Sequence, residues 1–228
     1  NSLILFAIGT GIGCLAFISY ITAIKKISIG IVFTLSASCN LLMISLLDYF
    51  LNSVTYNWLV LFGALLILVS ILILNFEYIF KVKQSEENFR GIFHSVIAGL
   101  LWGFATYLND LALEEARFID AALVRTIVWI ILPAILTLAI RKNFDFITNN
   151  KLYSIKIIIA AILATLSTLF WFISLNYTSG SLSVIFGNTS PIFALIIGYL
   201  FLKEKISIYQ LFGILVSLGG VSLVILFI

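Results

Sequence analysis

Four consecutive residues, Asn188, Thr189, Ser190 and Pro191, place an amide, two hydroxyls and a proline inside a long apolar stretch. Proline lacks a backbone N–H, so within a helix it removes one hydrogen bond and leaves carbonyl oxygens without a donor. Freed carbonyls beside amide and hydroxyl groups make a surface that can bind a polar molecule. The same side chains could instead hydrogen-bond to a neighbouring helix. We expect a helix that is interrupted near Pro191.

Arg125 is a second residue whose type and position could do chemistry. It follows Asp120 by five residues and begins an apolar stretch, "VRTIVWIILPAILTLAI". Its guanidinium could reach the polar end of the helix, pair with an acidic group, or neutralise an anionic substrate. These three interpretations stay open at the level of the sequence.

Further polar and aromatic residues occur in equally apolar surroundings. Ser36 and Asn40 are candidates for the same kind of polar surface as Asn188. Aromatic rings could line a binding cavity, although rings at a membrane interface are more common. The aromatic candidates are Tyr20, Trp102, Tyr107 and Trp171.

Residues for catalysis or metal binding are sparse. His94 is the only histidine, with no evident partner, and the two cysteines, Cys14 and Cys39, do not make a metal site. The carboxylates of the acidic 109–120 connection, "NDLALEEARFID", match no standard metal-binding spacing. We expect no cofactor, no metal and no enzyme activity, with an enzyme built on this connection as the alternative.

The elements that position these residues must lie in lipid. The chain is 62% hydrophobic and 10% charged, whereas a soluble domain carries about 25% charged residues. Its apolar stretches are apolar on every side, which is typical of helices and not of barrel strands. The sequence therefore predicts an all-α integral membrane protein with about eight transmembrane helices, at approximately 3–24, 29–50, 57–76, 91–108, 119–140, 153–176, 181–202 and 207–228.

Small residues and charges refine this picture. In "GTGIG", Gly9 and Gly13 indicate close helix packing. Asp48 lies near the end of a predicted span, where we expect it to reach water.

Basic residues favour the cytoplasmic side of a membrane, and they concentrate in every second connection. The sequence thus predicts a multi-pass protein of the cell membrane, without nucleic-acid partners, whose cytoplasmic connections are 25–28, 81–90, 141–156 and 203–205.

The sequence also contains an internal repeat. Residues 17–70 and 170–220 share a span, a short hinge, a second span, a polar turn and a third span with Gly63 or Gly213. Two more spans lie between them, so the unit has five helices, and an odd number gives two copies of opposite orientation. We predict that 1–80 are the last three helices of a first copy and 91–228 a complete second copy. Two further helices are then expected before Asn1, which makes the chain an N-terminally truncated fragment.

The second copy resembles the EamA-type unit of the drug/metabolite transporter superfamily. The matching pieces are "LLWGFATYL", "FIDAALVRTIVW" with Arg125, "SLNYTSGSLSVIFGNTSPIFALI", "FLKEKIS" and "QLFGILVSLGGVSLVIL". The first copy departs from the second at Pro191, where it has Cys39 or Asn40. The resemblance implies a ten-helix parent with both termini in the cytoplasm, which is the reverse of the orientation that the basic connections predict.

These features favour a secondary transporter, either an exporter or an exchanger. The resemblance implies small metabolites such as amino acids or their analogues as cargo. Inverted repeats place a substrate near the middle of the membrane and move it by alternating access. The expected partners are a small-molecule substrate and membrane lipid, with a homodimer also considered. The alternatives are the membrane enzyme described above and a non-transporting membrane scaffold.

Overall fold

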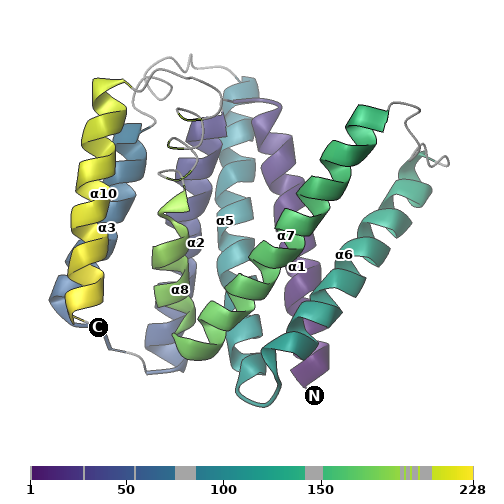
Figure 1. Ribbon diagram of the computed structural model, residues 1–228, viewed down its shortest axis with the longest axis horizontal. Helices are drawn as coiled ribbons and strands as arrows, with labels where there is room; N and C mark the ends of the chain where they lie inside the picture. The colour runs from purple at the N-terminus through teal and green to yellow at the C-terminus, as the bar shows by residue number, and fades with distance from the viewer. Residues whose placement is uncertain are drawn as a thin grey trace. The chain divides into compact units, whose positions relative to one another are not determined.

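A computed structural model of the protein describes residues 2–27, 29–53, 55–74, 86–141, 151–190, 193, 196, 200 and 207–227. These residues form a series of helices (Figure 1). The helices are α1 (Ser2–Ile24), α2 (Ile29–Leu51), α3 (Trp58–Leu74), α5 (Glu86–Leu113), α6 (Phe118–Arg141), α7 (Lys151–Tyr177), α8 (Gly180–Gly187) and α10 (Ile208–Phe227). The all-α prediction is confirmed. Of the predicted helix 181–202, the structure describes α8 at its start and single residues further on.

Length and composition make several of these helices able to cross a bilayer. Within the described residues, the candidate spans are Ser2–Ile24, Ile31–Leu51, Glu86–Leu113, Phe118–Leu136 and Ile155–Tyr177, with shorter apolar helices at Trp58–Ile73 and Leu211–Phe227. Each longer span has at least the length that a hydrocarbon core of about 30 Å requires. Their outer faces carry large exposed apolar side chains, such as Ile158 and Leu163 on α7, which is the surface that lipid covers.

Parts of the sequence-based predictions fall on residues outside the described set. Pro191 is one of them, and so are the basic connection 203–205 and the stretches 75–85 and 142–150. The prediction of an interrupted helix can still be followed up to Ser190. The last regular residue of α8 is Gly187, and the next two residues form a turn. There the Thr189 N–H bonds to the Phe186 carbonyl at 3.0 Å, three residues back rather than four.

The described chain divides into two compact units. Unit 1 consists of Asn1–Cys14 and Ala105–Ser179, and unit 2 consists of Leu15–Phe104 and Gly180–Ile228. Each unit therefore combines residues from both predicted repeat copies, and each is considered by itself below.

Unit 1 is held together by an apolar cluster, the Phe6 cluster, at one end of its helices. Phe6 and Phe172 meet edge to face, with ring centroids 6.0 Å apart and an interplanar angle of 83°. Alanines from α5 and α6 let these helices approach the rings closely. The buried members of the cluster are Phe6, Ala112, Leu113, Ala121, Ala122, Phe172 and Leu175.

In unit 2, α5 packs on α2 through glycines. A Cβ added at Gly99 would collide with the Ser36 carbonyl and lie 2.6 Å from the Cys39 Cβ. One turn further along α5, a Cβ at Gly103 would lie 2.7 Å from the Asn40 carbonyl oxygen. The backbones can be this close because both positions lack a side chain, and the two contacts advance in the same direction along both helices.

The helices α3 and α10 form the second close pair of unit 2 and lie side by side in Figure 1. A Cβ at Gly63 would lie 2.7 Å from the Gly220 carbonyl oxygen and 2.9 Å from Val224, whereas a Cβ at Gly220 would lie 2.9 Å from Ile67. Positions further along α3 thus meet earlier positions of α10, so the pair is antiparallel. Antiparallel packing is expected for corresponding helices of two oppositely oriented copies.

Candidate functional site

Two amide side chains among the polar candidates of unit 2 each have one buried atom without a hydrogen-bond partner among the described residues. Asn188 is 6% exposed, and its Nδ2 has no hydrogen-bond partner among the described residues. The Asn40 Oδ1 is also buried without a partner. A buried polar atom left unpaired costs about 1–3 kcal/mol. One unsatisfied donor and one unsatisfied acceptor are thus available in the same unit.

The contact between α2 and α8 places these amides at the same level. The start of α8 is fixed by Asp48, near the end of α2, which accepts a hydrogen bond from the Ser181 N–H at 3.0 Å. Eight residues back along α2 is Asn40, and seven residues forward from Ser181 is Asn188. Both steps cover about 11–12 Å of helix. Between these levels, Ile44 of α2 and Val184 of α8 are buried.

Asp48 corrects the expectation of a water-exposed carboxyl group. Its side chain is 0% exposed. It accepts hydrogen bonds from the Ser181 N–H, from the Ser181 hydroxyl and from Asn52 Nδ2, the last at 3.2 Å. An acidic group at a helix N-terminus also interacts favourably with the helix dipole. Asp48 therefore positions α8, and with it Asn188.

Two aromatic candidates lie close to this level. The rings of Tyr20 and Trp102 have centroids 5.1 Å apart, at 48° to each other. Trp102 precedes Gly103, whose contact with the Asn40 carbonyl brings α5 against α2. The half-buried Tyr20–Trp102 pair thus belongs to the same region of unit 2 as the two amides. We name Asn40, Asn188, Tyr20 and Trp102 the amide site.

The other candidates of unit 2 differ from these four. Ser36 is buried, but its hydroxyl donates to the Phe33 carbonyl of its own helix at 3.2 Å. Ser190 is exposed. His94, for which the sequence offered no partner, has one in Ser19: the hydroxyl lies 3.0 Å from His94 Nδ1 and donates to the His94 carbonyl at 3.1 Å. No signal in the sequence pairs residues so far apart.

The remaining candidates belong to unit 1. Tyr107 is buried, and Trp171 packs against the Phe6 cluster. The Arg125 guanidinium lies over the Phe172 ring, 5.7 Å from its centroid. Gly9 packs closely, as expected, because a Cβ there would lie 2.8 Å from the Asn109 Oδ1. The expectation was wrong for Gly13, where a Cβ would meet nothing within 4 Å.

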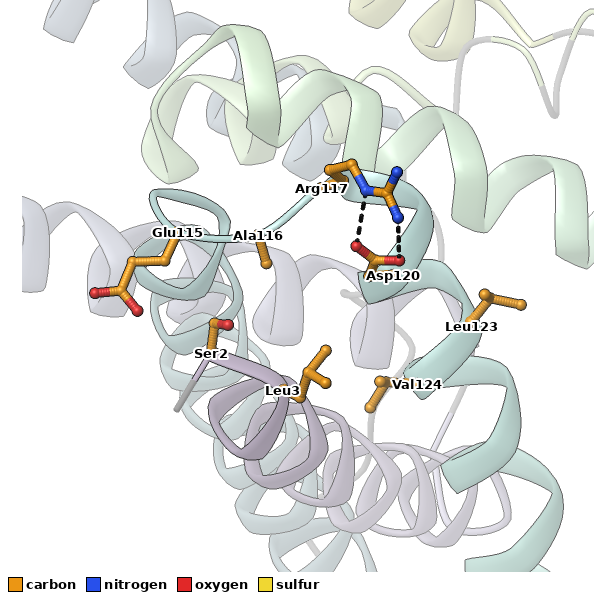
Figure 2. Close-up of a pocket in the computed structure, with 8 residues that line it drawn as sticks. All are labelled: Ser2, Leu3, Glu115, Ala116, Arg117, Asp120, Leu123 and Val124. Atoms are coloured by element: carbon orange, nitrogen blue, oxygen red, sulfur yellow. Dashed lines mark hydrogen bonds and ion pairs between the residues drawn. The ribbon is translucent and has the colours of Figure 1, made fainter.

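A pocket of about 590 Å³ lies at the acidic connection of unit 1 (Figure 2). Arg117 binds both oxygens of Asp120 there, at 3.1 and 3.2 Å, and this bonding raises the pKa of the Arg117 guanidinium. Across the described residues, no group of three His, Cys, Asp or Glu side chains could hold a metal ion. The lining residues are Ser2, Leu3, Glu115, Ala116, Arg117, Asp120, Leu123 and Val124.

Comparison with known proteins gives the class of the chain. The sequence profile of the EamA-like transporter family matches residues 89–226, so the chain belongs to this family. An uncharacterized transporter of Archaeoglobus fulgidus is 24% identical over 209 residues, which are 92% of this chain and 70% of that protein. One crystal structure of a protein superposes with a TM-score of 0.76 at 13% identity, covering 99% of this chain and 86% of the other.

The family and the apolar helices together define a multi-span membrane transporter. Its environment is membrane lipid, and its class implies a small-molecule substrate.

Proposed function

We propose that the protein is a secondary transporter, an exporter or exchanger of small metabolites such as amino acids or their analogues. It works by alternating access in the cell membrane, with the basic connections in the cytoplasm. Inverted repeats and an interrupted helix are the usual setting of such a site. The amide site of unit 2 binds the polar part of the cargo.

One observation supports this proposal above the others. Asn40 and Asn188 each bury a polar amide atom that no described residue satisfies. Polar groups inside a membrane are expensive and are generally retained for function. A small metabolite with one donor and one acceptor satisfies both atoms at once, while the Tyr20–Trp102 pair offers an aromatic wall for its apolar part.

The local backbone supplies a place for movement. Asp48 fixes the start of α8, whereas α8 ends in the turn at Asn188 and Thr189. Elements that absorb a change of backbone angles during domain closure are commonly helix ends of this kind. Cargo binding at Asn188 therefore acts next to the point where the helix can change direction.

The test is transport by the full-length protein in proteoliposomes, with a mixture of labelled polar metabolites as cargo. Asn188→Leu removes the amide, and we expect the affinity for the best cargo to weaken about 5- to 150-fold, as for the loss of a buried hydrogen bond of about 1–3 kcal/mol. Ser222→Leu is the control, because Ser222 is exposed and bonds within its own helix. Movement of no metabolite would refute transport, and normal uptake by Asn188→Leu would refute the amide site.

A further inference from the structure

We propose that unit 1 contains a binding site for a small oxyanion, a carboxylate or a phosphate, centred on the Arg125 guanidinium. The inference goes beyond the transport proposed above and does not depend on it, because it concerns residues of unit 1 alone and is tested by binding.

The first observation is a cation without an anion. Arg125 lies inside the candidate span Phe118–Leu136. Among the described residues it has no hydrogen bond and no salt bridge, and its recorded contact is the Phe172 ring. The acidic side chain at the start of its own helix, Asp120, is held by Arg117. A charged side chain within a span generally has a partner or faces a cavity, so the free guanidinium indicates a bound anion.

The second observation is a hydroxyl without a partner on the facing helix. Thr10 is 3% exposed, and its Oγ1 has no partner among the described residues. Thr10 lies one turn after Phe6 and one turn before Cys14, on the same face of α1. Phe6 packs against Phe172, and the Phe172 ring also lies under the Arg125 guanidinium. Thr10 is therefore at the level of the guanidinium, one turn beyond the Phe6 cluster.

A third polar group comes from α5 at the same level. Asn109 is 5% exposed, and its Oδ1 is buried without a partner among the described residues. This oxygen lies against α1, 2.8 Å from where a Gly9 Cβ would be. On α5, Asn109 lies one turn before Leu113 of the Phe6 cluster. On α6, Arg125 lies one turn after Ala121 of the same cluster. Three helices thus each present an unsatisfied polar group just beyond the cluster.

There is also space for a ligand at this level. Gly13 follows Gly9 by one turn and is buried. Nevertheless, a Cβ added at Gly13 would meet no atom within 4 Å. A buried glycine beside open space marks a hollow on this face of α1.

The chemistry of the three groups selects an oxyanion. A guanidinium presents paired N–H donors that match two oxygens of a carboxylate or phosphate. The Thr10 hydroxyl can donate one further hydrogen bond, and the Asn109 Oδ1 can accept one from a protonated oxygen of the ligand, such as that of hydrogen phosphate. The Phe172 ring beneath the guanidinium attracts its positive charge and helps to hold it in place. Either a free anion or the phosphate of an anionic lipid offers these oxygens.

The test is thermal unfolding of the full-length protein in nanodiscs of phosphatidylcholine, with acetate or phosphate replacing chloride at equal ionic strength. Binding at 100 times Kd should raise the unfolding midpoint by several degrees, at about 2–4 °C per kcal/mol for a chain of this size. Arg125→Gln should lose this shift, whereas Arg117→Gln, which alters an exposed arginine of the same unit, should keep it.

A second pair of variants tests the position without removing a charge. Gly13→Leu fills the hollow and should abolish the shift, whereas Gly11→Leu makes the same change at a position of α1 that also has open space but faces away from Gly13. If the oxyanion is a lipid phosphate, discs with phosphatidylglycerol should stabilise the wild type but not Arg125→Gln, and acetate should add nothing there. The proposal is overturned if acetate, phosphate and phosphatidylglycerol all leave the wild-type midpoint unchanged. It is equally overturned if Arg125→Gln, or Gly13→Leu where that variant folds, responds as the wild type does.

Discussion

Adjacent glycines on α10 allow a direct test of the packing between α3 and α10. In Gly220→Ala the new Cβ would lie 2.7 Å from the Gly63 carbonyl oxygen and 2.9 Å from an Ile67 side-chain carbon. A backbone oxygen cannot move aside as the end of a side chain can, so the two helices must separate. Gly219→Ala adds the same methyl group one residue earlier, where nothing lies within 4 Å.

The expected magnitude follows from these contacts. Overpacking of a close contact typically costs about 1–3 kcal/mol. Both variants share the better helix propensity of alanine, worth up to about 1 kcal/mol, so this gain cancels in the comparison. With about 2–4 °C per kcal/mol for a chain of this size, Gly220→Ala should unfold roughly 2–12 °C below Gly219→Ala.

The assay is thermal unfolding of purified protein in one detergent, followed by tryptophan fluorescence. Gly63→Ala is a second test of the same contact, because its Cβ would lie 2.7 Å from the Gly220 carbonyl oxygen, and it should behave like Gly220→Ala. Equal midpoints for Gly220→Ala and Gly219→Ala would show that the helices are not in contact at this point.

Three further predictions concern contacts within unit 2. Asp48→Ala should lower the free energy of unfolding by about 1–3 kcal/mol, because it leaves the Ser181 donors buried without an acceptor; a double-mutant cycle with Ser181→Ala should show coupling, and strict additivity would contradict the contact. Ser19→Ala should cost about 1 kcal/mol through the lost bonds to His94, and less in a His94→Ala background, which keeps only the bond to the backbone carbonyl at position 94; an equal loss in both backgrounds would disprove the contact with the ring. Gly99→Ala should destabilise the protein, since its Cβ would collide with backbone of α2, and a wild-type midpoint would argue against this packing.

The helices could be predicted from sequence because the bilayer makes one simple demand, a continuous apolar stretch of sufficient length. The interruption after α8 could also be predicted, because Pro191 follows a few residues later in the sequence. The end of α8 at Gly187 could not be predicted. The position of this helix depends on the hydrogen bond between Asp48 and Ser181 at its start, which the sequence does not reveal. A carboxyl group near a helix end looks water-exposed until its distant partner is known.

The candidate residues show the same limit. Asn188 and Arg125 were recognisable by type, because amides and charges are rare inside apolar stretches. Thr10 was missed, since the surrounding "GTGIG" resembles a packing motif. Only its buried, unpaired hydroxyl in the structure distinguishes it. Residue type therefore predicts which side chains carry chemistry, and spatial neighbours decide which of them act together.

The bond between Asp48 and Ser181 joins residues that are 133 positions apart. During synthesis, Asp48 enters the membrane long before Ser181 leaves the ribosome. Its carboxyl group therefore lacks the Ser181 N–H and hydroxyl donors during that time. Until the later helix arrives, water or the insertion machinery has to accommodate that group. The contact between α2 and α8 can therefore form only after Ser181 has been synthesised, and a chain stopped before Ser181 should be a good substrate for membrane quality-control proteases.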